Sequence, residues 1–134
     1  MLRKFVLATG LCTLIAGCVY VPAASGRYLQ IRTQKASPVS TQFSLRTQED
    51  CAKFLTIIAN AFAVLGNTTA RQIFEIASCT DVSASADLRA TTTLRDKNGV
   101  LVYVVEMIGV EQCRELVRTA QKSDTETFSE CKAQ

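Results

Sequence analysis

The segment Leu88–Met107, LRATTTLRDKNGVLVYVVEM, decides how this chain folds. Its two halves, residues 88–97 and 100–107, are rich in threonine, valine and leucine. Asn98 and Gly99 lie between the halves, and an Asn-Gly pair between two such runs is the strongest short-range signal of a β-hairpin. The segment therefore predicts two antiparallel strands joined by a tight turn.

A two-residue turn also fixes how the two predicted strands pair. It places Leu94 opposite Tyr103 and Arg95 opposite Val102. The second strand, residues 100–107, carries apolar side chains on both of its faces. Because such a strand needs neighbours on both sides, we expect it to lie in the centre of the sheet.

Two further segments have apolar residues at the spacing of an amphipathic helix. Gln48–Leu65 begins after Thr47, which can cap the helix, with Asp50 three residues later. Glu111–Gln121 is the second predicted helix. The residues expected to face the core are Cys51, Phe54, Leu55, Ile58, Phe62 and Leu65 in the first helix, and Val110, Cys113, Val117 and Ala120 in the second.

The first predicted helix is apolar over more than one narrow face. Ile57, Ala61 and Val64 widen its apolar stripe. A wide stripe is compatible with core packing, which we expect, and with a face that contacts lipid or a protein partner, which is the alternative.

The other strands complete a sheet. Alternating side chains predict strands at Tyr28–Thr33 and Val39–Arg46, and a last short strand at Thr127–Lys132. Ala70–Thr80 fits a strand or a short helix with a capping box at Thr69, and we assign it as a strand. The predicted fold class is α+β: a small two-layer domain with two helices packed on one face of a mainly antiparallel sheet.

The chain contains a faint architectural repeat. When Cys51 is aligned with Cys113, each half consists of a predicted hairpin, a helix with a cysteine near its start, and a returning segment with a second cysteine. Few identities accompany this match, so the sequence leaves open whether the halves arose by duplication.

The N-terminus has the pattern of an export signal. Arg3 and Lys4 precede an apolar run that ends in Leu-Ile-Ala-Gly-Cys at residues 14–18. This ending resembles a bacterial lipobox. The resemblance implies that residues 1–17 are a signal peptide that is removed, and that Cys18 is acylated. Residues 18–26 would then be a lipidated tether, and residues 27–134 a single domain.

The lipobox resemblance also implies a location. Val19 follows Cys18, in place of the aspartate that retains lipoproteins of this class in the inner membrane of enterobacteria. We therefore expect a lipid-anchored protein on the periplasmic face of the outer membrane. The alternatives are secretory cleavage after Ala23 or Ala24, which would leave a soluble periplasmic protein, and a cytoplasmic core helix. The apolar run is shorter than the roughly 20 residues of a membrane span.

Four cysteines remain beyond residue 18, and an even number in an exported protein predicts two disulfides. Four cysteines allow three connectivities. Their positions relative to the predicted elements favour Cys51 with Cys79 and Cys113 with Cys131. Structural zinc is the competing use, but zinc ligands usually come in close pairs, and no two of these cysteines are close in sequence.

The sequence offers little catalytic chemistry. It contains no histidine, and its six glycines do not match phosphate-binding spacing. The carboxylate pairs Glu106 with Glu111 and Asp81 with Asp87 are the candidates for acid–base work. Chance pairing among twelve acidic residues explains them as well, so we assign no catalytic, cofactor-binding or metal-binding residue.

The net charge of the whole chain is +3, and removal of Arg3 and Lys4 lowers it by two. This charge gives no reason to expect a nucleic-acid partner, and no small-molecule ligand is evident. We therefore expect a non-enzymatic binding or assembly protein of the cell envelope. It would contact the membrane through lipid on Cys18, and an envelope protein would be its partner.

Two other functions remain open from the sequence. An inhibitor or immunity protein against a periplasmic hydrolase would need a protruding loop, for which Ser83–Asp87 is the candidate. A small hydrolase would need the carboxylates of Glu106 and Asp81. The residues proposed for a binding surface on the hairpin are Arg89, Thr91, Thr93 and Arg95.

Overall fold

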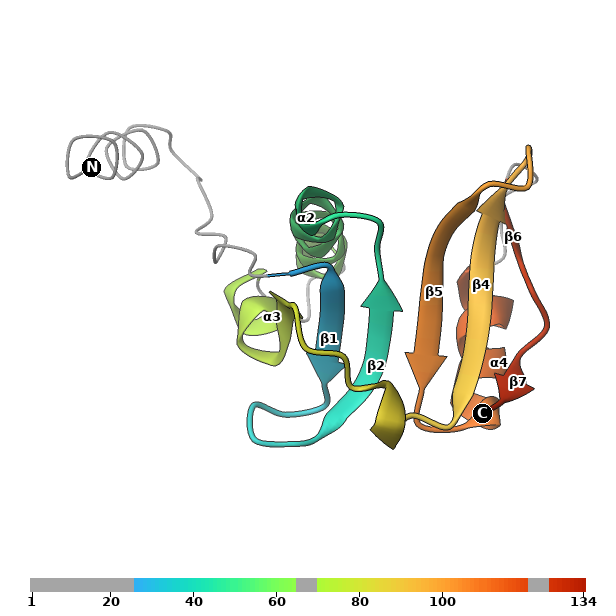
Figure 1. Cartoon of the computed structure of the whole chain (residues 1–134). Coiled ribbons are helices and arrows are strands. Elements are labelled where there is room, and N and C mark those ends of the chain that lie inside the picture. The colour runs from blue at the N-terminus through green and yellow to red at the C-terminus, as the bar shows by residue number, and fades with distance from the viewer. Residues whose placement is uncertain (1–25, 65–69, 121–125) are drawn as a thin grey trace.

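The computed structural model describes residues 26–64, 70–120 and 126–134 (Figure 1). The predicted signal peptide, the lipidated Cys18 and all of the tether except Gly26 lie outside these segments, as do Leu65 and the side chain of Phe62. Within the described segments, no helix is long and apolar enough to cross a membrane.

The fold is α+β, as predicted, and is built on one antiparallel sheet of seven strands in the described residues. Six strands follow the order β3-β1-β2-β5-β4-β6, and β7 also pairs with β4. The strands are β1 (Tyr28–Arg32), β2 (Val39–Ser44), β3 (Ala77–Thr80), β4 (Ala90–Asp96), β5 (Leu101–Met107), β6 (Glu126–Phe128) and β7 (Lys132–Ala133). The prediction that residues 100–107 form a central strand is confirmed, because β5 lies between β2 and β4.

Two long helices, α2 (Gln48–Val64) and α4 (Val110–Ala120), lie behind the sheet in Figure 1. The predicted N-cap of α2 is confirmed, because the backbone N–H of Asp50 donates to the Thr47 hydroxyl at 3.1 Å. In α4, Cys113 is buried as expected, whereas Ala120 is exposed, so its predicted inward orientation is wrong. Leu116 packs against the core cluster in its place.

The assignment of Ala70–Thr80 as one strand is wrong for its first part. Residues 70–76 form a third helix, α3 (Ala70–Ile76), and only Ala77–Thr80 pairs with β1. The physical reason is helical burial: Ile73 is buried, Ile76 three residues later packs on the same core, Glu75 is exposed, and α3 packs on α2. The last predicted strand is likewise divided into β6 and β7, with Cys131 between them.

The β4–β5 hairpin has a three-residue loop instead of the predicted two-residue turn. The pair Leu94–Tyr103 is confirmed, but a bulge places Arg95 opposite Leu101, so the predicted pair of Arg95 with Val102 is wrong. The cause is Gly99, whose φ of 78° ends the loop in the left-handed region. A left-handed glycine after a type I turn is typical of three-residue hairpin loops, and the separate register shift between Leu94 and Arg95 returns Leu94 to its predicted partner Tyr103.

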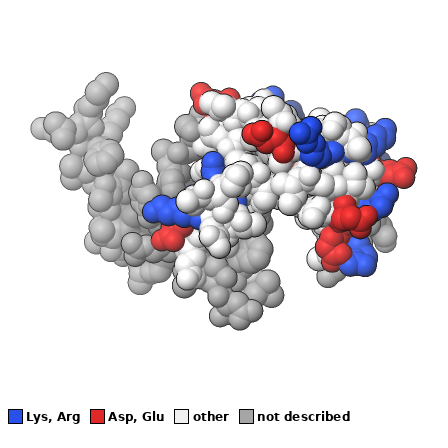
Figure 2. All heavy atoms as spheres, turned by 90° about the horizontal axis from the view of Figure 1, so that it is seen from below, with Lys and Arg blue, Asp and Glu red and all other residues white. Residues whose placement is uncertain are grey.

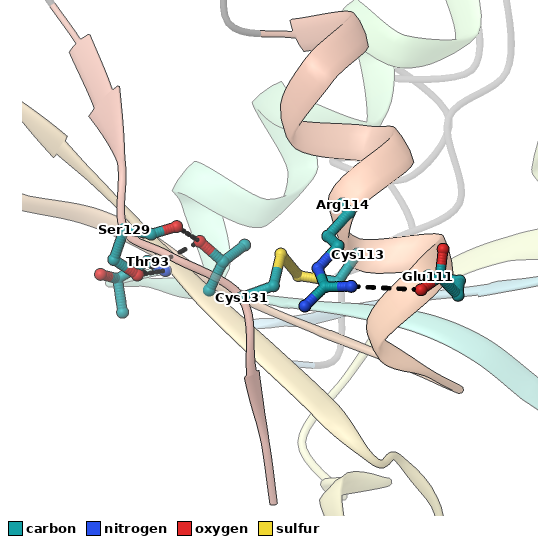
Figure 3. The surroundings of a disulfide bond; sticks show 7 residues. Thr93, Glu111, Cys113, Arg114, Ser129 and Cys131 are labelled. Atoms are coloured by element: carbon teal, nitrogen blue, oxygen red, sulfur yellow. Dashed lines mark hydrogen bonds and ion pairs between the residues drawn. A yellow bond between two sulfur atoms is a disulfide. The ribbon is translucent and has the colours of Figure 1, made fainter.

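The two disulfides are Cys51–Cys79 and Cys113–Cys131, as the cysteine positions predicted. Each ties the first turn of a long helix to a segment at the outer side of its half of the sheet. Figure 3 shows the second disulfide, where Cys131 follows Ser129, whose hydroxyl accepts a hydrogen bond from the Thr93 backbone at 2.9 Å.

The two halves of the fold have the same order of elements on either side of the junction between β2 and β5. Each half contributes a hairpin, a helix and a returning strand, and the half-sheets β3-β1-β2 and β5-β4-β6 join at β2 and β5. The shift in residue number that aligns Cys51 with Cys113 also aligns Phe43 with Val105. These two residues are paired across the junction of β2 and β5. The architectural repeat seen in the sequence is therefore present in the order of the strands and long helices, and α3 has no counterpart among the described residues of the second half.

The core lies between the sheet and the helices α2 and α3, and nine of the ten residues of its buried cluster come from the first half of the fold, with Val105 the tenth. Leu29, Phe43 and Val105 form one buried row across the middle strands. The rings of Phe43, Phe54 and Tyr103 contact one another, with centroids 5.0 to 5.3 Å apart. Such tilted and edge-on pairs are favourable beyond the area they bury.

Candidate functional site

The candidate site is a surface hollow of about 490 Å³ between α2 and the loop end of the β4–β5 hairpin. We call it the hairpin hollow and define it by Phe54 and Ile57 of α2, and by Val100, Leu101 and Tyr103 at the start of β5. Both walls come from the elements that the sequence predicts best. The hollow itself arises because distant segments meet there.

Apolar side chains are exposed in this hollow to an unusual degree. The exposed fractions are 63% for Ile57, 52% for Val100 and 37% for Leu101. Scattered exposed apolar residues need no explanation, but several around one concavity mark an interaction site. Ile57, one of the residues that widen the apolar stripe of α2, is therefore exposed and does not pack in the core.

Tyr103 lies at the floor of the hollow, where its ring contacts those of Phe54 and the core residue Phe43. Burial, and to a lesser extent the negative charge of Glu126, raise the pKa of its phenol to about 12. The hydroxyl therefore stays neutral at physiological pH and can act as a hydrogen-bond donor to an occupant of the hollow.

Charged side chains surround the apolar centre on two opposite sides. The α2 side carries Arg46, Asp50 and Lys53, and the hairpin side carries Asp96 and Glu126. An apolar centre within a charged rim is the usual anatomy of a protein interface. The hollow can bind an apolar group and orient it by charge, and its side chains include no nucleophile with an adjacent base.

A second hollow, of about 620 Å³, lies at the other end of β5. The offset that relates the two halves takes Lys53, Phe54 and Ile57 to Glu115, Leu116 and Thr119, which line this second hollow. Figure 2 views the molecule from this end and shows it concave in the middle, with mixed charges on the α4 half.

The two equivalent hollows differ in chemistry. In the second hollow, Thr119 stands in the position of Ile57, and Leu116 stands in the position of the aromatic Phe54. The glutamates of α4 are also engaged, because Arg114 pairs with Glu111 and Arg118 pairs with Glu115. Of the two, only the hairpin hollow is lined by exposed large apolar side chains, those of Ile57, Val100 and Leu101, which makes it the better candidate site.

The predicted carboxylate pairs are not assembled into a site. Glu106 lies in a row with Gln30 and Gln42, on the sheet face opposite the helices, whereas Glu111 is an exposed residue of α4. The sheet therefore separates the two carboxylates. Asp81 and Asp87 are both exposed and lie at opposite ends of the segment that crosses the sheet from β3 to β4.

The carboxylate of Glu106 belongs to a buried polar layer. It accepts hydrogen bonds from Gln42 Nε2 at 3.2 Å, from the Ser85 hydroxyl at 2.7 Å and from Gln134 Nε2 at 2.7 Å. The side chain of Gln30 also donates to Gln42, at 3.0 Å. Every buried side-chain polar atom in the described residues has a partner. This layer therefore serves the fold.

The segment predicted as an inhibitory loop, Ser83–Asp87, lies across the face of the sheet in front of β1 and β2 (Figure 1). The Ala84 backbone N–H donates to Gln42 Oε1 at 2.8 Å, and Ser85 donates to Glu106. The segment covers the polar layer and does not protrude.

The other predicted surface lies away from the hairpin hollow. Thr91 is opposite Glu106, and Thr93 and Arg95 follow on the same face of β4. The Arg95 guanidinium donates to the Gly99 carbonyl at 3.0 Å and so closes the hairpin loop. Arg89 is exposed just before β4. Sequence reasoning missed Val100, Leu101 and Glu126, and its only signal for this site was the apolar Ile57 beside the core stripe of α2.

All cysteines of the described residues are in disulfides, and no group of three potential metal-binding side chains is present among these residues. Comparisons of the chain with protein-family models, curated proteins and solved structures found no match.

Proposed function

We propose that this protein is a lipid-anchored binding or assembly component of the cell envelope, held in the outer membrane by acyl chains on Cys18. Its contact surface is the hairpin hollow, and it acts by binding instead of by catalysis. The lipobox-like ending at residues 14–18 supports the anchor. The two disulfides are typical of an oxidising compartment and so agree with export.

The observation that carries the proposal is the exposed apolar group Ile57, Val100 and Leu101 over an aromatic floor. Covering such a group with a partner removes apolar surface from water, which is the main favourable term in protein association. The charges around it supply orientation and selectivity.

The site lies close to the proposed anchor. The Arg27 guanidinium donates to the Leu45 carbonyl at 3.1 Å, and Leu45 and Arg46 line the hairpin hollow. Gly26, just before Arg27, lies against the backbone of Thr80 and Asp81, where no Cβ would fit. A fully extended tether from residue 18 to residue 25 reaches about 25–30 Å. The hollow would therefore meet partners near the membrane surface.

Site-specific photocrosslinking in cells tests the contact surface. A photoreactive amino acid is placed at Ile57, or at Val82 as the control, which is 68% exposed on the crossing segment. The proposal expects a discrete adduct from position 57 and none from position 82. Equal labelling from both positions, or none from position 57, contradicts it.

Palmitate labelling tests the anchor separately. The wild-type chain is expected to incorporate label and to fractionate with membranes, and the Cys18→Ser variant is expected to lose both properties. A wild-type chain that takes up no label refutes the lipid anchor.

A further inference from the structure

The charges around the hairpin hollow are divided between its two sides. On the α2 side, Arg46 and Lys53 form no ion pair with any residue that the structure describes. Asp50 also lies on this side, in the first turn of α2, where a negative charge is stabilised by the helix dipole. Among the described residues that line the hollow, the charged groups of the hairpin side are Asp96 and Glu126, which are both acidic. One side is therefore net positive and the other negative.

This division is self-complementary under a twofold rotation. A twofold axis through the centre of the hollow places the α2 side of each copy against the hairpin side of the other copy. Lys53 and Arg46 of each copy then face Glu126 and Asp96 of its partner. A single ligand charge of either sign would be attracted by one side and repelled by the other, whereas a second copy brings a side of opposite charge to each of the two sides.

The apolar groups are divided in the same way. Ile57 and Phe54 belong to α2, and Val100 and Leu101 belong to the start of β5. The same rotation packs the exposed Val100 and Leu101 of one hairpin against the exposed Ile57 of the other copy, twice. Apolar contact at the centre and opposite charges at the rim are what an isologous interface requires.

We propose that the occupant of the hairpin hollow is a second copy of this chain, so that the protein forms a twofold-symmetric dimer. This inference rests on the proposed function for the choice of surface. Lipid anchors would assist it, because two copies held in one membrane meet at a higher effective concentration than copies free in solution.

Charge reversal with complementation tests the dimer. The full-length chain and the variants Lys53→Glu and Glu126→Lys are purified in mild detergent, and their self-association is measured by sedimentation velocity. Each variant alone places like charges at both symmetric contacts, so we expect about a tenfold loss in self-association. An equimolar mixture of the two variants restores opposite charges at both contacts, and we expect it to dimerise like the wild type.

Lys35→Glu is the matched control, because Lys35 is an exposed lysine in the turn between β1 and β2, outside the hollow. It should dimerise like the wild type, and circular dichroism checks that all variants are folded. A monomeric wild type, or a mixture that behaves like its separate variants, overturns the inference. If the wild type is monomeric while position 57 crosslinks to a different protein, the dimer is refuted and the proposed contact surface stands.

Discussion

Replacing Glu106 by glutamine separates a structural role for this carboxylate from a chemical one. Glutamine has nearly the same shape, so the substitution changes charge and hydrogen bonding only. The carboxylate accepts three hydrogen bonds, from Gln42, Ser85 and Gln134, and only 7% of the residue is exposed. All three partners present a donor toward it. An amide at position 106 can accept through its oxygen, but its nitrogen must face a donor.

The magnitude follows from these contacts. One charge-assisted hydrogen bond is lost, and such bonds contribute about 1.5–3 kcal/mol each. The other two become neutral bonds of about 1 kcal/mol, and removing a buried charge offsets part of the loss. We expect Glu106→Gln to lower the free energy of unfolding by about 2 kcal/mol. For a domain of this size, that shifts the urea midpoint down by about 1–2 M.

The assay is urea denaturation followed by circular dichroism, with Glu115→Gln as the control. Glu115 is an exposed residue of α4, so this variant should stay within about 0.5 kcal/mol of the wild type. Photocrosslinking from position 57 should be unchanged in Glu106→Gln, since the two residues lie on opposite sides of the sheet. If Glu106→Gln kept the full free energy of unfolding but lost the function of the protein in the cell envelope, the structural role of Glu106 would be refuted. That result would favour the alternative of a hydrolase that uses this carboxylate.

Three other predictions concern the hairpin half of the fold. Replacing Cys113 and Cys131 together by alanine opens a link with a sequence separation of 18, and the chain-entropy model predicts a loss of about 3 kcal/mol in urea unfolding; a loss below about 1 kcal/mol would contradict it. Gly99→Ala should destabilise by about 1–2 kcal/mol because alanine resists a left-handed backbone, and a neutral effect would argue against the bulged loop. Tyr103 should titrate near pH 12 by tyrosinate absorbance. The folded state keeps a proton that the unfolded state releases near pH 10, so the free energy of unfolding should fall between about pH 10 and 12. Tyr103→Phe should remove that part of the decline. A Tyr103 pKa near 10 would refute the burial of this phenol.

Local patterns in the sequence were sufficient where neighbours along the chain determine the structure. The Asn-Gly pair located the β4–β5 hairpin, and Thr47 located the start of α2. The disulfides followed from the position of each cysteine relative to a helix start and a returning segment. The hairpin and the helix start depend on residues that are close in sequence. The disulfides depend on a choice among only three possible pairings of four cysteines.

Tertiary contacts decided the features that the sequence did not predict. Residues 70–76 are equally suited to helix and strand, and packing against α2 selected the helix. Gln42 reads as a solvent-facing position of a strand, but the crossing segment covers it and makes it fully buried. The hairpin hollow likewise needs α2, β5 and β6 in place before its residues share a surface.

Side-chain footprinting of the lipidated chain in native membranes tests the contact surface most directly. Ile57 and Val82 are almost equally exposed in the isolated chain, at 63% and 68%. Their hydroxyl-radical oxidation rates, each normalised to the unfolded chain, should therefore be similar if nothing covers the hollow. We expect Ile57 to be protected several-fold more than Val82 in membranes. Equal protection of the two residues would contradict the assignment of the hairpin hollow as the contact surface.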